Sequence, residues 1–326
     1  MQGNHSNPAI RAVGLVKRYR GDVVALDGLS FSVEPASVFG LLGPNGAGKS
    51  TTVKILSTLA RADAGQASVA GIDVMTQPAR VREMIGTVGQ RIAVDPDATG
   101  RENLSLQGRI RGMSGRQLRS RIDELLERFG LRDAAGRLGR TYSGGMQRKL
   151  DVAMGLIHRP RVLFLDEPTT GLDPEARAEL WAEIDRLTRE DGLTILLTTH
   201  YLEEADRLAS RLAIVDRGRV VATGTPDDLK AELRGDAIQV ELADGASHEI
   251  AVGVLSRVPG LAESLVDGRS LRARAERGAA AVPAVLSALE GAGIGVASVT
   301  VSRPSLDDVY LRYTGRAYRP TQESYA

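Results

Sequence analysis

Nine consecutive residues, 43–51, combine three glycines, a lysine and two hydroxyl side chains in the order GPNGAGKST. This order matches G-x-x-x-x-G-K-[ST], a loop whose backbone N–H groups surround the phosphates of a bound nucleotide. Glycine allows the backbone to curl in this way, and the N-terminus of a following helix favours negative charge. The sequence therefore predicts a binding site for a nucleoside triphosphate.

Within this loop we expect the side chains to contact different parts of the nucleotide. Lys49 would reach the β- and γ-phosphates, and the hydroxyl of Ser50 would bind Mg²⁺. The remaining residues that we expect to complete the phosphate site are Gly43, Asn45, Gly46, Gly48 and Thr51.

The loop lies between two predicted elements, an apolar strand at residues 37–42 and a helix at residues 50–59. From about residue 10 to residue 233, strand-like and helix-like segments alternate, which predicts an α/β domain with a largely parallel core sheet. The clearest further elements are apolar strands at 162–166, 194–198 and 212–216, and a helix from Pro174 to about Glu190.

Two parts of the chain depart from this alternation. Residues 98–155 are mostly helical in pattern, with an apolar stripe that predicts a helical subdomain. From residue 236 an alternating segment, a turn at 244–245 and apolar residues at 250 and 252 predict a β-hairpin, and Ser305 begins a last helix that ends near Gly315. We therefore expect an N-terminal tail, a nucleotide-binding domain, a small C-terminal α+β domain and a flexible tail at 1–9, 10–233, 236–315 and 316–326.

Composition narrows the class of protein. The 326 residues carry a net charge of +1 with 25% charged side chains, so no strong field would attract a polyanion, and we expect no nucleic-acid partner. The sequence has no cysteine, no apolar segment after Met1 and no apolar run of about 18 residues. These features predict a cytoplasmic protein without a signal peptide or membrane span.

Four further segments follow the phosphate loop in a specific order: Gln90 after residues 86–89, YSGGMQ at 142–147, an apolar strand ending in Asp-Glu at 162–167, and His200 after a strand. With the loop, they resemble the nucleotide-binding subunits of ATP-binding cassette (ABC) transporters over about residues 10–233. The resemblance implies an α/β fold: a P-loop (RecA-like) ABC ATPase core with an antiparallel β subdomain and a helical subdomain.

The resemblance also implies roles in ATP hydrolysis. Asp166 would hold the water shell of Mg²⁺, and Glu167 would polarise the attacking water. His200 would contact the γ-phosphate, Gln90 would contact the metal and the water, and Tyr19 would stack on adenine. Each role has a plainer alternative. Asp166 and Glu167 could be two acids at a strand end that face solvent, and His200 could be a buried histidine without a role. Gln90 could be an ordinary loop amide, and Tyr19 an exposed tyrosine.

The segment Ser143-Gly144-Gly145 precedes a predicted helix, where serine can cap and glycine permits close approach of an anion. In the family this signature contacts the ATP held by a second subunit, which implies a homodimer around two ATP molecules. Asp173 resembles a loop that crosses the same interface, although helix capping also explains an aspartate before proline. Met146 departs from the usual glutamine, and whether Gln147 replaces it is left open.

Three segments, YSGGMQRKLD, LDEPTTGLDP and SLDDVYLRYTGR, resemble daunorubicin-resistance-type exporter ATPases over nearly the whole chain. That resemblance implies a separate multi-spanning permease on the membrane, with this ATPase attached at its cytoplasmic face. It also implies export of a hydrophobic drug, antibiotic or lipid-like compound that contacts the permease and has no direct site on this chain. For the C-terminal domain, a packing or dimer-stabilising role is favoured over a ligand sensor.

Other classes of ABC protein fit less well. A translation factor would carry two cassettes, and a chromosome-maintenance ATPase would insert a coiled coil where only 93 residues separate Lys49 from Ser143. Glu167 and His200 together favour hydrolysis over a purely regulatory nucleotide-binding module. An importer ATPase with a C-terminal regulatory domain is the nearest alternative, which the C-terminal resemblance disfavours.

Overall fold

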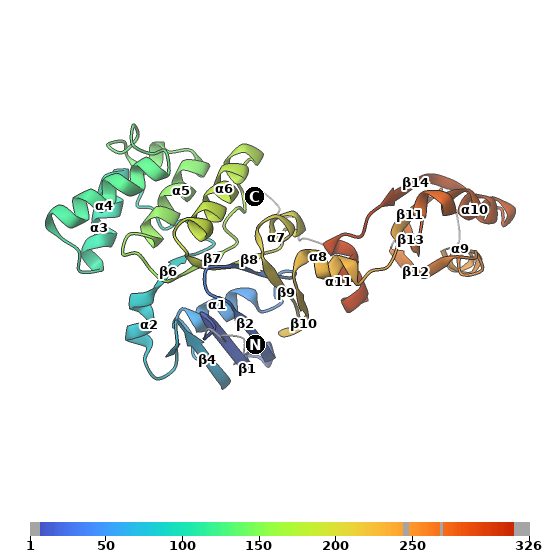
Figure 1. Ribbon diagram of the computed structural model, residues 1–326, viewed down its shortest axis with the longest axis horizontal. Coiled ribbons are helices and arrows are strands. Elements are labelled where there is room, and N and C mark those ends of the chain that lie inside the picture. The colour runs from blue at the N-terminus through green and yellow to red at the C-terminus, as the bar shows by residue number, and fades with distance from the viewer. Residues whose placement is uncertain (1–6, 244–247, 268–269, 316–326) are drawn as a thin grey trace, which may run out of the picture. The chain divides into compact units, whose positions relative to one another are not determined.

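A computed structural model describes residues 7–243, 248–267 and 270–315 of the chain, which divides into two compact units after Thr225 (Figure 1). The sequence places the domain boundary later, between residues 233 and 236. The difference arises because α8 (Pro226–Ala231) packs against α11 (Leu306–Thr314) and so belongs to the second unit. Residues 1–6 of the expected tail at 1–9, the expected tail at 316–326 and the turn at 244–245 lie outside the described residues.

A six-stranded sheet forms the centre of the first unit, in the order β10-β9-β3-β8-β7-β6, and all neighbours are parallel except β10 and β9. Every residue of the two central strands, β3 and β8, is buried, as expected for parallel strands that are covered on both faces. The strands are β3 (Val38–Leu42), β6 (Ile85–Val88), β7 (Val162–Asp166), β8 (Thr194–Thr199), β9 (Arg211–Asp216) and β10 (Arg219–Gly224). The predicted α/β core is therefore confirmed.

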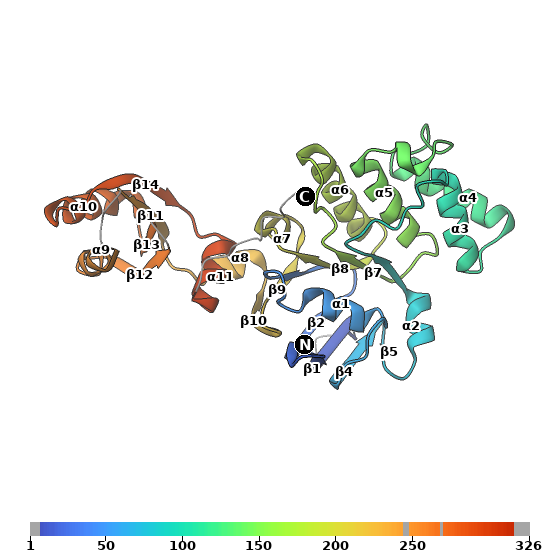
Figure 2. The same ribbon diagram turned by 180° about the vertical axis from the view of Figure 1, so that it is seen from behind.

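A second sheet in this unit is antiparallel and has the order β2-β1-β4-β5. Helix α1 (Lys49–Leu56) contacts β2 and β4 on one side and β7 on the other, so it connects the two sheets through one apolar core (Figure 2). Helix α2 (Pro78–Met84) leads from β5 to β6. The strands of this sheet are β1 (Ile10–Tyr19), β2 (Val23–Val33), β4 (Ala64–Val69) and β5 (Ile72–Asp73).

The helical subdomain contains α3 (Gly100–Ile110), α4 (Gly115–Arg128), the 3₁₀ turn η1 (Gly139–Thr141) and α5 (Gly144–Gly155). The four residues of its predicted apolar stripe are at most 5% exposed; they are Leu118, Ile122, Leu125 and Leu126. Helix α6 (Pro174–Arg189) packs against α5, and α7 (Leu202–Leu208) packs against α6 and β3. The stripe thus joins the subdomain to the core that positions the nucleotide loop.

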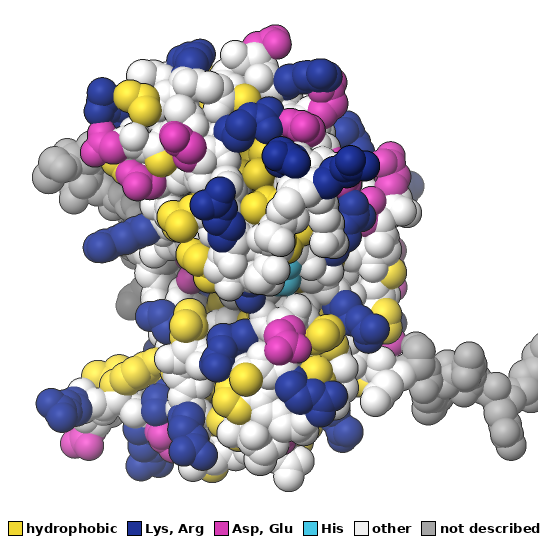
Figure 3. All heavy atoms as spheres, turned by 90° about the vertical axis from the view of Figure 1, so that its left-hand side faces the viewer, with side chains coloured by type: hydrophobic (Ala, Val, Ile, Leu, Met, Phe, Trp, Pro, Cys, Tyr) yellow, Lys and Arg dark blue, Asp and Glu magenta, His cyan; other side chains and the backbone are white. Residues whose placement is uncertain are grey.

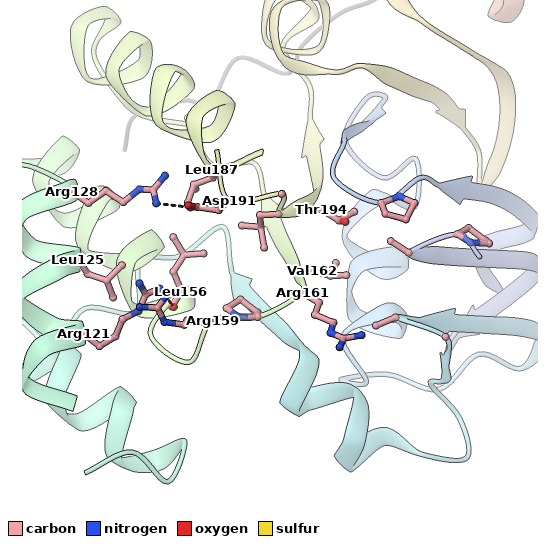
Figure 4. A pocket seen from close by; sticks show the side chains of 18 of the residues that line it. Arg121, Leu125, Arg128, Leu156, Arg159, Arg161, Val162, Leu187, Asp191 and Thr194 are labelled. Atoms are coloured by element: carbon pink, nitrogen blue, oxygen red, sulfur yellow. Dashed lines mark hydrogen bonds and ion pairs between the residues drawn. The ribbon is translucent and has the colours of Figure 1, made fainter. Parts of the chain in front are cut away.

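A cavity of about 610 Å³ separates α4 of the helical subdomain from the amino ends of β7 and β8 (Figure 4). Ion pairs connect its walls: Arg128 on α4 contacts Asp191, and Arg159 before β7 contacts Glu124 on α4. This cavity lies at the ends of the strands opposite to the phosphate-binding loop, because β7 begins at Val162 in the cavity and runs to Asp166. The ion pairs hold the helical subdomain against the core.

The second unit consists of a four-stranded antiparallel sheet in the order β12-β13-β11-β14, with α9 and α10 packed against it. The chain order β-α-β-β-α-β with this strand order is the ferredoxin-like arrangement. Its elements are β11 (Asp236–Leu242), α9 (His248–Leu255), β12 (Leu261–Asp267), β13 (Ser270–Ala275), α10 (Gly278–Gly291) and β14 (Val296–Ser302).

The predicted hairpin partner of β11 is wrong, because the residues expected to form it belong to α9. Ala251 and Leu255 are buried one helical turn apart, while Ile250 is 59% exposed. The apolar residues of this segment therefore follow the period of a helix, and β11 pairs instead with β13 and β14. The last predicted helix is present as α11, with a capping box at Ser305.

None of the helices in the described ranges is both long and apolar enough to cross a membrane. The face formed by the helical subdomain and α2 carries Lys, Arg, Asp and Glu side chains interspersed with hydrophobic ones (Figure 3). Two of the exposed hydrophobic residues, Leu106 and Ile110, lie one turn apart on α3 and are 57% and 69% exposed.

Candidate active site

The phosphate-binding loop connects β3 to α1, and it is held close to neighbouring backbone. A Cβ atom on Gly43 would lie 2.3 Å from the carbonyl oxygen of Val215, and one on Gly48 would lie 2.6 Å from that of Ala25. Gly48 also has a φ of 109°, in the left-handed region that favours glycine. Glycine is therefore required at both positions for the loop to keep this path.

Lys49 is the first residue of α1, and its side chain is only 4% exposed. Its ammonium donates to the carbonyl oxygens of Gly43 at 2.8 Å and Pro44 at 3.2 Å, and it lies 3.3 Å from Oε1 of Glu167. Burial lowers the pKa of Lys49 below its ordinary value, and the carboxylates of Glu167 and Asp166 offset only part of this effect. The loop thus holds a cation beside the carboxylate of Glu167.

Two hydroxyl groups connect Asp166, the last residue of β7, to its surroundings. Its Oδ1 accepts hydrogen bonds from Ser50 Oγ at 3.1 Å and from Thr198 Oγ1 at 2.6 Å. The carboxylate is therefore held next to the hydroxyl of Ser50 at the start of α1.

Glu167 lies at the centre of the polar contacts and is 6% exposed. Its Oε2 accepts a hydrogen bond from Gln90 Nε2 at 3.1 Å and lies 3.1 Å from Nδ1 of His200, while Oε1 faces Lys49. Burial acts to raise the pKa of Glu167, but the contacts with His200 and Lys49 outweigh it, so the pKa lies below its ordinary value. Glu167 is therefore ionised at neutral pH, which a proton acceptor requires.

A cavity of about 460 Å³ opens beside these residues, which is within the range typical of small-molecule sites. Tyr19, 43% exposed, and the neighbouring residues Val23, Val24 and Ala25 form one wall. The predicted site residues that line the cavity are Tyr19, Asn45, Gly46, Gly48, Lys49, Ser50, Thr51, Gln90 and Glu167. Gly43, Asp166 and His200 adjoin them through the contacts described above.

Besides Gly43, Asp166 and His200, four predicted site residues do not line this cavity: Ser143, Gly144, Gly145 and Asp173. Ser143 caps α5 by accepting a hydrogen bond from the backbone N–H of Met146 at 3.2 Å, and Asp173 caps α6 by accepting one from Ala176 at 2.8 Å. Ser143, Gly144 and Asp173 are exposed, and Gly145 is half-buried. One chain alone therefore leaves the signature segment and Asp173 at the surface, away from its own phosphate-binding loop.

The departure from the common signature has a structural consequence. Met146 is partly buried and packs against the core of the helical subdomain, while Gln147 donates from Nε2 to the carbonyl oxygen of Gly139 at 3.1 Å. The amide of Gln147 is thus hydrogen-bonded inside the subdomain.

Sequence reasoning missed two residues that hold this site together. Thr198 contacts both Asp166 and the backbone N–H of Glu167. A hydroxyl side chain two residues before His200, near the end of the same strand, is a signal in the sequence that could have identified it. Arg148 contacts the backbone carbonyl of Glu167, but a partner of this kind leaves no pattern in a sequence.

A phosphate-binding loop, an Asp-Glu pair at the end of β7, His200 after β8 and a helical subdomain with an exposed signature together define the ATP-hydrolysing subunit of an ABC transporter. The family model for ABC transporters matches residues 26–170, and the model for the C-terminal domain of DrrA1-3-like ATP-binding proteins matches residues 224–314. The chain belongs to the daunorubicin-resistance (DrrA) family of ABC transporter ATP-binding proteins.

Relatives and a solved structure agree with this assignment. The chain is 48% identical to daunorubicin resistance ATP-binding protein DrrA2 of Streptomyces coeruleorubidus, over 98% of each chain. It is 45% identical to daunorubicin/doxorubicin resistance ATP-binding protein DrrA of Streptomyces peucetius, over 97% of this chain and 96% of the relative. A dimeric bacterial ABC transporter cassette superposes with a TM-score of 0.61 at 26% identity, covering 66% of this chain and 98% of the cassette.

Proposed function

We propose that this ATPase works as a homodimer that encloses two ATP molecules and drives a separate membrane permease, which exports a hydrophobic drug, antibiotic or lipid-like compound. One observation carries the proposal: the nucleotide cavity contains the phosphate-binding loop and Glu167 but not the signature at Ser143. The site is therefore incomplete within one chain, and a second copy supplies the missing surface.

The signature is suited to that role. Ser143 and Gly144 are exposed at the N-terminus of α5, a helix of 12 residues, where backbone N–H groups favour a phosphate. A head-to-tail arrangement places this end of one copy against the γ-phosphate held by Lys49 of the other. Asp173 is exposed at the start of α6 and crosses the same interface. The similarity to a dimeric ABC cassette supports this arrangement.

In the hydrolysis step, the oxygen of a water molecule attacks the γ-phosphorus and the bond from that phosphorus to the β–γ bridging oxygen breaks, giving ADP and inorganic phosphate. Glu167 accepts the proton of the attacking water. His200 and Gln90, both within 3.1 Å of Glu167, orient this carboxylate and the water. Lys49 stabilises the negative charge on the transferred phosphoryl group.

The residues around Asp166 suit a magnesium ion, because Mg²⁺ prefers oxygen ligands and binds through few carboxylates together with phosphate. Ser50 and Asp166 already adjoin each other through a hydrogen bond of 3.1 Å, and the amide oxygen of Gln90 is a third candidate. Ser50, Asp166 and Gln90 would hold the ion, which would neutralise charge on the β- and γ-phosphates. Tyr19 on the wall of the cavity would stack on adenine.

The permease contacts the exposed apolar face of α3, which Leu106 and Ile110 form. Leu106 and Ile110 are neighbours on one face of the helix, and contiguous exposed apolar surface marks sites of protein–protein contact. This contact would hold the ATPase at the cytoplasmic face of the membrane. The transported compound itself contacts only the permease.

Two observations favour an exporter of hydrophobic compounds over an importer. The C-terminal unit matches the DrrA1-3-like domain, and the relatives carry names that refer to daunorubicin and doxorubicin resistance. The C-terminal unit itself serves as a packing or dimer-stabilising module.

The proposal is tested by ATP hydrolysis and light scattering on the purified full chain, wild type beside Glu167→Gln. Wild type should hydrolyse ATP, whereas the variant should turn over about 100-fold or more slowly and form a dimer only when ATP is present. Hydrolysis at the wild-type rate in the variant would exclude Glu167 as the base. A variant that stays monomeric at saturating ATP would contradict the dimer.

The permease contact is tested separately by affinity isolation of the tagged chain from detergent-solubilised membranes of its own cells. Wild type should retain a multi-spanning membrane protein, and Ile110→Glu should lose it while keeping its ATPase activity. Leu59→Glu, at a residue that is 74% exposed on the core, is the matched control and should retain the partner. Equal retention by both variants would rule out α3 as the contact.

A further inference from the structure

Arg148, on α5, is almost completely buried, with 2% of its surface exposed. All five of its N–H groups donate hydrogen bonds, which is the full capacity of an arginine. The acceptors are the carbonyl oxygens of Gly89 (2.7 Å), Gln90 (3.4 Å), Glu167 (3.1 Å) and Pro168 (2.7 Å), and Oδ2 of Asp151 (3.1 Å).

These contacts join three separate parts of the active site. Gly89 and Gln90 follow β6, whereas Glu167 and Pro168 follow β7, and Arg148 itself lies five residues after Ser143 of the signature. A single side chain therefore connects α5 to the backbone that follows β6 and to the backbone that follows β7, both of which contribute residues to the nucleotide cavity.

The contact with Glu167 matters because the backbone of this residue is strained. Its φ is 50°, in the left-handed region that glutamate rarely adopts because its side chain makes that conformation strained. Such a conformation persists only where the surroundings impose it. Thr198 accepts the backbone N–H of Glu167 through its carbonyl and its hydroxyl, both at 3.1 Å, and Arg148 donates to the carbonyl oxygen of Glu167.

We propose that Arg148 is a positioning residue that holds Glu167 in this strained conformation, and that it thereby aims the carboxylate at the attacking water. The inference rests on the proposed role of Glu167 as the base and deepens it. Because Arg148 belongs to the helix that begins at the signature, it also ties the placement of Glu167 and Gln90 to the position of that helix. Contact of the signature with ATP in the partner copy then acts on the base of the same chain.

A purely structural role for Arg148 would give different experimental results. In that case Arg148 would serve only as the buried partner of Asp151, whose Oδ1 in turn accepts the backbone N–H of Ala93 at 3.4 Å. Lysine keeps the charge and can keep the pair with Asp151, but its compact ammonium has three donors and lacks the planar fork of arginine. Arg148→Lys therefore separates the charge from the geometry that reaches Glu167.

The experiment measures steady-state ATP hydrolysis and thermal unfolding of the full chain for wild type, Arg148→Lys and a control. The expected result for Arg148→Lys is a loss of about tenfold or more in kcat, with KM for ATP within about threefold of wild type. Lys149→Gln is the control, because Lys149 is the next residue on α5 and pairs with Glu179, which is half exposed. It should keep the kcat of wild type.

Two further variants make the test decisive. In the Glu167→Gln background, Arg148→Lys should cause no additional loss of the residual rate, because it acts through a carboxylate that is already absent. Asp151→Asn should keep kcat within about threefold of wild type, because the four carbonyl contacts of Arg148 remain.

The proposal is overturned if Arg148→Lys keeps the wild-type kcat, or if its loss multiplies with that of Glu167→Gln. It is also overturned if Arg148→Lys fails to fold and Asp151→Asn loses activity together with thermal stability, since the ion pair alone would then explain the residue. Glu167→Gln alone, assayed in parallel, reports on the proposed function: wild-type turnover there would remove the base itself, whatever the result at Arg148.

Discussion

The ammonium nitrogen of Lys49 lies 3.3 Å from Oε1 of Glu167, so the cation of the phosphate-binding loop and the carboxylate after β7 form a buried ion pair beside the nucleotide cavity. In the proposed cycle both groups act on the γ-phosphate. ATP must therefore compete with Glu167 for Lys49, because the phosphate oxygens and the carboxylate seek the same ammonium.

Removing the charge of Glu167 should strengthen ATP binding. Glu167→Gln frees Lys49 from its ion pair and removes a negative charge near the phosphates, so the Kd for ATP should fall about fivefold, which corresponds to about 1 kcal/mol. Calorimetric titration without divalent cations, where neither protein turns over, measures the change. Glu175→Gln, an exposed acid on α6, is the control and should bind as wild type does. Weaker binding by Glu167→Gln would mean that the ion pair does not compete with ATP.

Removing the ammonium should have the opposite effect. A hydrogen bond to a charged group contributes about 1.5–3 kcal/mol, so Lys49→Ala should raise the Kd for ATP by about 10- to 150-fold. Lys54→Ala, at an exposed position of the same helix, should change it little. The same titration compares the two, and thermal unfolding confirms that both variants are folded. An unchanged Kd in Lys49→Ala would remove Lys49 from the phosphate site.

A charge at the signature should block assembly without affecting binding to a single chain. Ser143→Glu should keep the ATP affinity of the monomer, because Ser143 lies outside the cavity of its own chain, and should abolish the ATP-dependent dimer by repelling the partner's phosphate. Light scattering and ATP titration measure the two properties. Ser114→Glu, at the exposed N-cap of α4, should still dimerise.

Mixing two inactive variants gives a sharper form of this test. A pair of Ser143→Glu and Lys49→Ala chains contains one composite site in which the lysine and the serine are both native. The mixture should therefore regain ATP hydrolysis that neither variant shows alone. No recovery at any mixing ratio would argue against a site shared between two copies.

Stability should depend on pH through Glu204. This side chain on α7 is fully buried and accepts hydrogen bonds from Thr169 at 2.8 Å and from Trp181 Nε1 at 2.9 Å. Burial raises the pKa of Glu204, and hydrogen bonds from neighbouring side chains offset only part of that effect. The folded state therefore binds this proton more tightly than the unfolded state does, so the contribution to stability is complete below the unfolded pKa of about 4.3 and is lost as pH rises through the folded pKa.

Glu204→Gln cannot titrate and should lack this loss. Its free energy of unfolding relative to wild type should increase as pH rises from 4 towards 8, as measured by denaturant unfolding at each pH. Glu203→Gln alters the adjacent, exposed residue and should show no such trend. A parallel pH dependence in wild type and Glu204→Gln would show that Glu204 titrates normally in the folded protein.

Features that depend only on residues close together in the chain could be predicted from the sequence. The glycine and lysine spacing of 43–51 identifies the phosphate loop, and the apolar strands and the stripe of α4 follow from hydrophobic periodicity. Asp173 before Pro174 marks the start of α6. These features could be predicted because loop curvature, helix capping and amphipathic spacing are local properties of the chain.

The sequence was less informative where a pattern had more than one solution. The apolar residues of 250–255 fit a strand as readily as one short helix. Only their packing against β12 and β13 of the C-terminal unit shows that they form a helix, α9. The unit boundary at Pro226 likewise depends on contact between α8 and α11, which lie about 80 residues apart.

Tertiary structure alone decided which groups meet at the site. Gln90 and Glu167 are 77 residues apart in sequence, and Ser50 and Asp166 are 116 apart, yet both pairs are hydrogen-bonded because parallel strands bring their carboxyl ends to one edge. The strained backbone of Glu167 and its support by Arg148 were beyond prediction for a further reason. Four of the five acceptors of Arg148 are backbone carbonyls, which every residue carries, so their positions are defined by the folded chain and by nothing in the residue types.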